Sequence, residues 1–262
     1  MGHTTDELNR SDRSGTLDHE QRPSPMLIRS MPSPVQDPFD LIDAAPEGGP
    51  FVVAQLGQSL DGRIATPTGV SRYINGGCAL DHLHRLRAHV DAVIVGVGTV
   101  IADDPMLTVR RVPGRNPARV FIDPHGRLPE AAHCVRSACA PRIAVRATAS
   151  PTLPGVVEIV IEACDGTIPP REIVRKLHER GLRKILVEGG ARTISTFIAA
   201  GCVDRLHMLV APMIIGSGVP GLLLPPIDEL DGALRPMTHV HVFADGDTLF
   251  DCNLRITRPA VR

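Results

Sequence analysis

The chain has 262 residues, of which 43% are hydrophobic and 22% charged, and its formal net charge at pH 7 is −1. This length and composition are typical of a globular protein with a substantial buried core. A near-neutral charge provides no field that attracts nucleic acid or an anionic membrane, and a 3% aromatic content without tryptophan leaves few side chains for base stacking. We therefore expect neither nucleic acid nor a membrane among its partners.

The cysteines and the N-terminal residues predict a cellular compartment. The chain has 6 cysteines but no Cys-x-x-Cys pair, so we expect reduced thiols. No apolar run approaches the ~18 residues of a membrane span. The polar start MGHTTDELNRSDRSG lacks the apolar segment of a secretion signal. These features predict a cytoplasmic location.

The composition changes near residue 49. Residues 1–48 are polar, carry scattered prolines and show little apolar periodicity, so we expect a flexible N-terminal extension. Within it, the segment DPFDLIDAA (37–45) has the composition of a short docking turn. Residues 49–258 are expected to form one folded domain.

In the folded part, predicted strands alternate with predicted helices. Strands are expected at residues 51–59, 91–98, 118–123, 141–147, 156–162, 183–190 and 203–216, with a further short strand after an Asp-Gly turn in SLDGRIAT (59–66). Helices are expected at residues 79–90, 169–181 and 191–201, the first with Leu80, Leu83, Leu86 and Val90 on one face. Residues 238–256 are typical of two antiparallel strands. The pattern predicts an α/β domain with a mostly parallel sheet and a C-terminal antiparallel hairpin.

The strongest candidate site is the stretch ILVEGGARTISTF, where a buried strand ends at Glu188 and two glycines lead into a helix. The free N–H groups and the positive dipole at the start of that helix suit a phosphate. Thr193, Ser195 and Thr196 add hydroxyl groups on or near its first turn. The alternative is a tight strand-to-helix turn with ordinary capping. The dinucleotide motif G-x-G-x-x-G is absent here.

The second candidate site is VIVGVGTVIADDPMLTVR (93–110). Gly96 and Gly98 follow a buried strand, so Thr99 is expected at the carboxyl edge of the sheet, where ligands bind in open α/β sheets. For Asp104, which precedes a proline, we favour capping of a turn, whereas for Asp103 capping and ligand binding are both open. Arg110 is either a solvated charge or a clamp for phosphate.

The sequence contains two His-x-His pairs, and neither predicts a metal site. His82 and His84 lie in a predicted helix, where residues i and i+2 diverge. His239 and His241 can share one face of a strand, but no carboxylate or thiol is grouped with them. Serine-nucleophile motifs and the zinc signature of deaminases are absent as well.

Taken together, these segments resemble a known enzyme family. SLDGRIA, LRAHVDAVIVGVGTVIADDPMLTVR, ARVFID, ILVEGG and VDRLHMLVAPMIIG occur in family order over about residues 51–255. They resemble the pyrimidine reductase of riboflavin biosynthesis, which forms the C-terminal half of a bifunctional deaminase-reductase, here without the deaminase half. The resemblance implies a three-layer fold like that of dihydrofolate reductase. It also implies NADPH as hydride donor, a phosphorylated small-molecule substrate and pairing as a homodimer.

The resemblance also implies site residues. Cofactor contacts are implied for Gly57, Tyr73, Thr99, Asp103, Gly189, Gly190, Ala191, Arg192, Thr193, Ile194, Ser195 and Thr196. Substrate contacts are implied for Ser71, Arg87, Leu107, Arg110 and Glu188, and a catalytic role for Glu188. The residues by themselves agree on the glycine turn and on Arg110, but Arg87 reads as a solvated helix charge. Pro124 stands where some members have a hydroxyl residue, which leaves His125, Arg127 and Arg146 as candidates to meet the 2′-phosphate of NADPH.

The activity implied is reduction of 5-amino-6-(5-phosphoribosylamino)uracil to its ribitylamino product, with hydride passing to the sugar C1′. Two alternatives remain open at this point. A reductase of dihydropterin or dihydrofolate type would share the fold and NADPH. A non-catalytic nucleotide-binding protein of the same fold would bind the cofactor without turnover, against which Glu188 and Arg110 argue.

Overall fold

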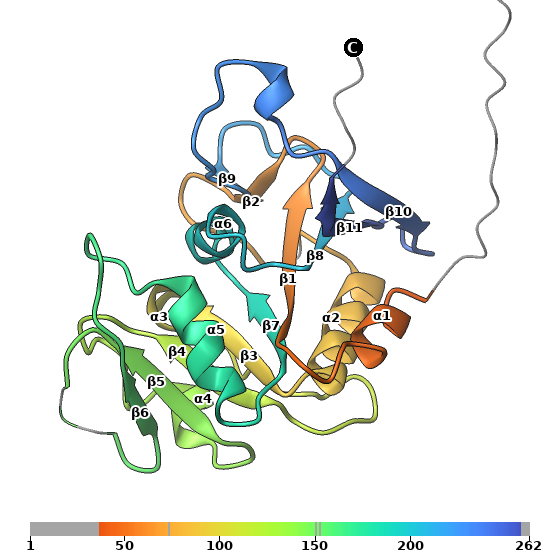
Figure 1. The fold of residues 1–262 in the computed structure, drawn as a ribbon. Helices are drawn as coiled ribbons and strands as arrows, with labels where there is room; N and C mark the ends of the chain where they lie inside the picture. The colour runs from red at the N-terminus through yellow and green to blue at the C-terminus, as the bar shows by residue number, and fades with distance from the viewer. Residues whose placement is uncertain (1–36, 73, 150, 152, 258–262) are drawn as a thin grey trace, which may run out of the picture. The chain divides into compact units, whose positions relative to one another are not determined.

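The computed structural model describes residues 37–72, 74–149, 151 and 153–257, and its centre is a nine-stranded sheet (Figure 1). The strand order is β10-β11-β8-β1-β7-β3-β4-β5-β6, and β2 and β9 pair separately as a two-stranded ribbon. Within the described part of the chain, no helix has the length and apolar character to cross a membrane.

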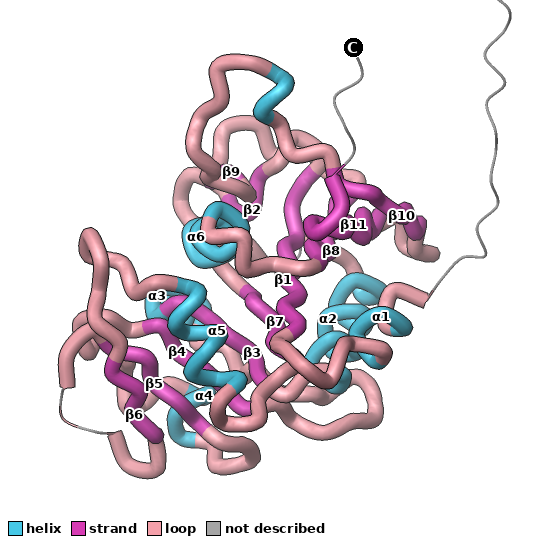
Figure 2. The backbone as a smooth tube through the Cα atoms, viewed as in Figure 1, coloured by secondary structure: helices cyan, strands magenta, loops and turns pink. Residues whose placement is uncertain are grey.

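The strands and helices have the following bounds. The strands are β1 (Phe51–Ser59), β2 (Arg63–Ala65), β3 (Ala92–Gly96), β4 (Ala118–Ile122), β5 (Arg142–Arg146), β6 (Val157–Val160), β7 (Lys184–Glu188), β8 (Arg205–Ala211), β9 (Val219–Pro220), β10 (Pro236–Val242) and β11 (Thr248–Thr257). The helices are α1 (Asp40–Asp43), α2 (Gly77–His89), α3 (Val97–Asp103), α4 (His133–Arg136), α5 (Pro170–His178) and α6 (Ala191–Ala199). The short 3₁₀ helix η1 (Leu230–Gly232) lies in the long loop between β9 and β10, which Figure 2 shows.

The sheet is parallel from β8 through β6, and only its C-terminal hairpin is antiparallel. β1 pairs in parallel with both β7 and β8, whereas β11 runs antiparallel to β8 and to β10. Gly246 in the hairpin turn has φ +90°, a left-handed conformation that favours glycine. The predicted mostly parallel sheet with a C-terminal antiparallel hairpin is therefore confirmed.

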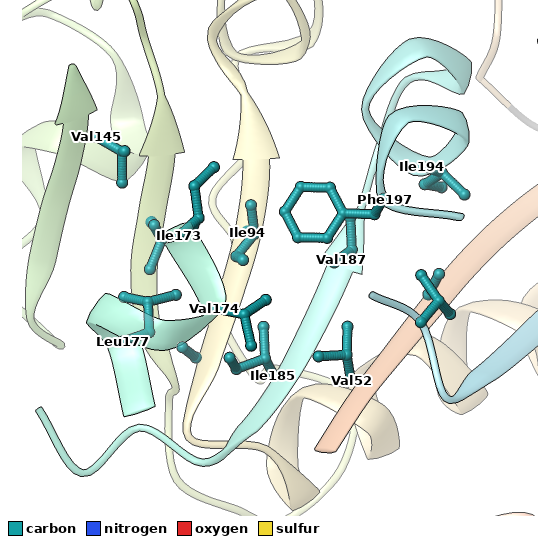
Figure 3. Close-up of a cluster of buried hydrophobic side chains, with 14 of the residues drawn as sticks. Val52, Ile94, Val145, Ile173, Val174, Leu177, Ile185, Val187, Ile194 and Phe197 are labelled. Atoms are coloured by element: carbon teal, nitrogen blue, oxygen red, sulfur yellow. The ribbon is translucent and has the colours of Figure 1, made fainter. Parts of the chain in front are cut away.

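One face of the sheet is covered by α5 and α6. Their apolar side chains join those of the strands in one buried cluster, and Figure 3 shows Phe197 of α6 pointing toward Ile94 of β3 and Val187 of β7. In the same view Ile173 and Leu177 of α5 lie over the neighbouring strands. The apolar residues whose spacing predicts these two helices are thus the ones that pack against the sheet.

The opposite face is covered by α1, α2, α3 and α4, which completes the expected three layers. Near the carboxyl ends of the strands this face becomes polar, because Glu188, Gln55 and His207 are register partners across β7, β1 and β8. All three are buried. A helix that crosses this region must present polar side chains to the sheet.

This polar region explains why α2 differs from its predicted inner face. Leu80, expected inside, is 42% exposed, whereas His82 and Arg87 are buried. His82 lies 3.0 Å from His207 and Arg87 is hydrogen bonded to Glu188, so the helix turns its polar residues toward the polar strands. Leu86 is buried as predicted.

Three helices, α1, α3 and α4, were not expected from the sequence. The predicted strand over 91–98 ends at Gly96, where α3 begins with Gly96 as its N-cap residue. The described residues belong to one unit that begins at Asp37, so residues 37–48, expected in the flexible extension, include α1. Phe39 and Ile42 are 2% and 0% exposed and belong to the buried cluster between the sheet and the helices α1 to α4. The ordered domain therefore begins before residue 49. The rest of the expected extension lies outside the described residues.

The docking of residues 37–43 on α2 predicts a stability effect. The Phe39 ring lies 5.0 Å from the rings of His82 and His89, and the Arg85 guanidinium lies 4.0 Å from its centroid. Phe39→Ala is expected to lower the free energy of unfolding by about 3 kcal/mol, as for other buried phenylalanines, measured by urea denaturation. Leu60→Ala, at a side chain that is 61% exposed, serves as the control and should change it little. Equal stability of Phe39→Ala and wild type would return the domain boundary to residue 49.

Candidate active site

A cavity of about 590 Å³ opens at the carboxyl edge of the sheet, beyond β3, β4 and β7. Residues that follow these three strands line it, together with residues of the β2–β9 ribbon and of the segment before α5. The predicted site residues in its lining are Ser71, Thr99, Asp103, Gly190, Ala191, Arg192, Thr193 and Thr196. In open parallel sheets ligands bind at this edge, so the cavity is the candidate active site.

The turns after β3 and β7 interlock at the floor of the cavity. The Gly190 N–H donates a hydrogen bond of 3.2 Å to the Thr99 hydroxyl. Gly189 has φ +95°, and a Cβ atom there would lie 3.0 Å from the same hydroxyl oxygen. At Gly96 a Cβ would lie 2.7 Å from the Thr193 hydroxyl. Glycine is therefore required by close approach of the two turns, and at Gly189 by the backbone conformation as well.

The N-terminus of α6 faces the cavity. Its N-cap residue, Gly190, has no side chain to cap the first N–H groups, and Ala191, Arg192 and Thr193 at the first turn line the cavity. Unpaired N–H groups, the helix dipole and an exposed arginine together favour an anionic group at this position.

Some predicted cofactor residues lie outside the cavity. Ile194 is fully buried in the core, and Ser195 is buried with its hydroxyl accepting a hydrogen bond of 2.7 Å from the Leu223 N–H. Gly57 lies against Asn75, whose Oδ1 would be 2.1 Å from a Cβ at residue 57. The side chains of Ile194 and Ser195 therefore pack away from the cavity, and Gly57 makes room for Asn75. Tyr73 lies outside the described residues.

The β2–β9 ribbon forms a wall of the cavity that the sequence did not predict. Val219 and Leu223 line the cavity, and Asp61 fixes the segment that leads to them. The Asp61 carboxylate accepts hydrogen bonds from the N–H groups of Ile215 (3.1 Å) and Gly216 (2.6 Å). A hydrogen bond from the Ser59 hydroxyl, together with these two, lowers the pKa of Asp61 to about 2. In the sequence, Asp61 carries only the signal of an Asp-Gly turn.

The three basic candidates for a phosphate differ in their surroundings. His125 and Arg127 are exposed and line the cavity. Arg146 is buried in ion pairs with Asp123 (3.0 Å) and Glu158 (2.9 Å), so it is not available to a ligand. This removes Arg146 from the predicted set.

The two adjacent aspartates after α3 also separate. Asp103 lines the cavity. Asp104 has φ +41°, and its carboxylate accepts a hydrogen bond of 2.8 Å from the His133 N–H at the start of α4. The carboxylate thus binds the start of a helix 29 residues along the chain and not the N–H groups of its own turn, which differs from the local turn cap expected before Pro105.

Arg87 and Glu188 form a buried ion pair beside the cavity. The Nε and Nη2 atoms of Arg87 each donate a hydrogen bond of 2.7 Å to Glu188, and neither residue is more than 6% exposed. Burial opposes the positive charge, but the Glu188 carboxylate outweighs it, so the pKa of Arg87 is raised. Arg87 is therefore not the solvated charge that the helix pattern indicates. Both Glu188 oxygens are engaged, which makes the pair a fixed element of the site.

The segment that follows Leu107 is held against this ion pair. Arg87 Nη1 donates to the Thr108 carbonyl (3.1 Å), and Arg110 Nη1 donates to the Thr108 hydroxyl (2.8 Å). Leu107 itself is 2% exposed with φ +53°, so its side chain packs in the core. The Arg110 side chain is exposed and forms no ion pair within the described ranges. Partial burial and the nearby Arg87 charge lower the pKa of Arg110, as expected for a cation that lacks an anion.

Comparison with known proteins places this site in a family. Residues 50–246 match the profile of the RibD C-terminal domain. A 2,5-diamino-6-ribosylamino-4(3H)-pyrimidinone 5′-phosphate reductase of Methanothermobacter thermautotrophicus is 35% identical over 196 residues, which are 71% of this chain and 89% of that protein. The riboflavin biosynthesis protein RibD of Bacillus amyloliquefaciens is 34% identical over 203 residues, 74% of this chain and 53% of that protein.

A solved structure agrees with these sequence matches. The diaminohydroxyphosphoribosylaminopyrimidine deaminase/5-amino-6-(5-phosphoribosylamino)uracil reductase of Thermotoga maritima superposes with a TM-score of 0.68 and 29% identity. The superposition covers 79% of this chain and 57% of that one, so this chain spans about half the length of the bifunctional relatives. The resemblance to the pyrimidine reductase of riboflavin biosynthesis is confirmed, and the chain belongs to the RibD C-terminal domain family.

Proposed function

We propose that the chain is an oxidoreductase that reduces a phosphoribosylaminopyrimidine of riboflavin biosynthesis to its ribitylamino product, with NADPH as hydride donor. The observation that carries the proposal is the match to an archaeal reductase over 89% of that protein's length. A cavity at the carboxyl edge of the sheet supports the same activity, and the exposed Arg110, which is not among the residues that line it, is the cation proposed for the substrate phosphate. We place the activity in the cytoplasm.

Two forms of the pyrimidine fit this proposal. The sequence motifs favour 5-amino-6-(5-phosphoribosylamino)uracil, the compound in the name of the Thermotoga reductase, whereas the archaeal relative is named for the 2,5-diamino-pyrimidinone. Both carry the same phosphoribosylamino group, and the reaction takes place on that group. For either substrate, the site must therefore bind the phosphate and hold C1′ in the same positions.

The residues around the cavity fit a dinucleotide with an additional phosphate. The first turn of α6 suits the pyrophosphate, and Thr99 and Asp103 lie on the same cavity wall. Exposed His125 and Arg127 are placed to meet a 2′-phosphate, since guanidinium binds phosphate through two parallel hydrogen bonds. When bound, NADPH supplies the hydride.

The protein's own contribution is binding and orientation. When the sugar ring opens to a protonated imine, the ring oxygen leaves C1′ and becomes a hydroxyl. Hydride then adds to C1′ and the electron pair of the C=N bond passes to the nitrogen, which already carries its proton, so the product is a secondary amine. Arg110 offers its free N–H groups to the substrate phosphate, and Arg87, itself held by Glu188, fixes the Thr108 carbonyl. Holding C1′ against the donor in this way lowers the entropic part of the barrier.

A turnover assay tests the proposal directly. Wild-type protein is expected to oxidise NADPH, followed by absorbance, with the uracil form, the diamino form or both. Arg110→Ala is expected to raise KM for the phosphorylated substrate roughly 10- to 100-fold, which is what one or two charge-assisted hydrogen bonds contribute. Arg115→Ala, an exposed arginine five residues along the chain, is the control.

The same assay separates the alternatives. Turnover of dihydrofolate without turnover of either pyrimidine would replace the proposal by a reductase of dihydrofolate type. NADPH binding without any turnover would identify a non-catalytic nucleotide-binding protein. An unchanged KM in Arg110→Ala would remove Arg110 from the site.

Cofactor preference is expected to depend on Arg127. Arg127→Ala should raise KM for NADPH by roughly tenfold or more and leave KM for NADH unchanged, because only NADPH carries a 2′-phosphate. Arg192→Ala, at the first turn of α6, should weaken both coenzymes alike. Steady-state kinetics with each coenzyme measure this, and an equal effect of Arg127→Ala on both would contradict the assignment.

We also propose that the chain forms a homodimer through its C-terminal hairpin. Val240 and Val242 of β10 are 54% and 73% exposed, and Phe250, the register partner of Val240, is 36% exposed. Three neighbouring apolar side chains on one sheet face are typical of a surface that another chain covers.

The hairpin surface predicts the effect of a single charge. Val242→Glu is expected to convert a dimer to a monomer, since burial of an unpaired carboxylate opposes association. Val160→Glu, at an exposed valine of the other edge strand β6, should leave the dimer intact. Sedimentation equilibrium measures both. A wild-type monomer, or a dimer that survives Val242→Glu, would contradict the proposal.

A further inference from the structure

We infer that His84 is a positioning residue for phosphate binding, because its ring nitrogen holds the backbone of Arg110 and thereby places the Arg110 guanidinium. The identity of the phosphorylated substrate rests on the proposed function, whereas the geometry of His84 and Arg110 does not. Nothing in the His-x-His pattern of the sequence indicates this role.

Three side chains at three-residue intervals on α2 hold the segment 108–111. Asp81 pairs with the Arg111 side chain, and His84 Nδ1 accepts a hydrogen bond of 2.9 Å from the Arg110 N–H. One turn further, Arg87 donates to the Thr108 carbonyl. Residues three apart lie on the same side of a helix, so α2 presents one row of contacts to the segment. His84 is the middle contact of this row and the one that reaches Arg110 itself.

The hydrogen bond to Arg110 requires an unprotonated Nδ1. His84 is 3% exposed. Burial, followed by the charges of Arg87, Arg110 and Arg111, lowers the pKa of His84 to about 4, against the opposing effect of Asp81. At neutral pH the ring is therefore neutral and Nδ1 is an acceptor. Arg110, the cation proposed for the phosphate, is one of the charges that keep it so.

The segment needs such support because its backbone is constrained. Leu107 is a non-glycine residue at φ +53°, a conformation that persists only where the surroundings hold it. Arg110 follows three residues later with an exposed side chain, whose hydrogen bond to another described residue goes to the Thr108 hydroxyl. Holding the Arg110 backbone reduces the freedom that phosphate binding would otherwise remove, so the cation is positioned before the ligand arrives.

Two amide substitutions separate acceptor geometry from side-chain bulk. The Asn oxygen in His84→Asn can occupy the position of Nδ1, whereas the Gln oxygen in His84→Gln reaches toward the position of Nε2. Ribose 5-phosphate, titrated by calorimetry, probes phosphate binding without any reduction. We expect His84→Asn to keep the affinity within about threefold and His84→Gln to weaken it roughly tenfold, the effect of one hydrogen bond.

A double-mutant cycle asks whether the effect passes through Arg110. In the Arg110→Ala background, His84→Gln should produce no further loss of affinity, because the group that His84 positions is gone. In turnover, His84→Gln should raise KM for the phosphorylated substrate and leave kcat within about twofold of wild type. His89→Gln, on the same helix and 31% exposed at its side chain, is the matched control and should have no effect on KM.

Several results would overturn the inference. These are an affinity of His84→Gln equal to wild type, an equal loss in both His84 variants, a full tenfold loss in the Arg110→Ala background, or no binding of ribose 5-phosphate by wild type. The proposed function fails separately, when wild type reduces neither pyrimidine. In that case, weaker ribose 5-phosphate binding by His84→Gln, restored in His84→Asn, would still support a phosphate site positioned by His84.

Discussion

The buried ion pair between Arg87 and Glu188 is the interaction on which the site depends. It joins the last turn of α2 to the end of β7, and the remaining Arg87 nitrogen holds the Thr108 carbonyl. Removing two charges from water costs free energy, and the pair compensates through short, doubly hydrogen-bonded geometry. Loss of one partner would leave an uncompensated buried charge. The relative positions of α2, β7 and the segment around Thr108 therefore depend on both residues.

The same polar layer continues across the sheet and determines how α2 lies on it. His207 contacts His82 of α2 on one side and lies 3.2 Å from Asp251 on the other. Burial opposes ionisation of Asp251, yet His207 and Arg205 outweigh it and lower the pKa of Asp251 to about 2. Polar contacts with one correct partner specify position more sharply than apolar packing does, because a shifted helix would leave buried groups unpaired. This layer therefore fixes the rotation of α2 about its axis, and with it the side of the helix that contacts the segment 108–111.

Much of the fold follows from the sequence because the strand and helix patterns are local. The buried strands and the glycine turn before α6 were predicted by their residues alone. The contact of Asp104 with His133 was not, because its place before a proline indicates only a local turn. The inner face of α2 was not, since Leu80 lies outside where apolar spacing would put it inside, and only the polar strands beneath explain why. The burial of Arg146 likewise depends on Asp123 and Glu158, whose proximity is set by the fold. Partners distant in sequence decide these cases.

Ser195 illustrates how one side chain outside a cavity affects its width. Its hydroxyl, on the buried side of α6, accepts the Leu223 N–H, and Leu223 belongs to the opposite wall. The helix that offers its first turn to an anion is thus tethered to the surface facing it. The spacing between these two parts of the cavity lining therefore depends on one hydrogen bond that lies outside the cavity.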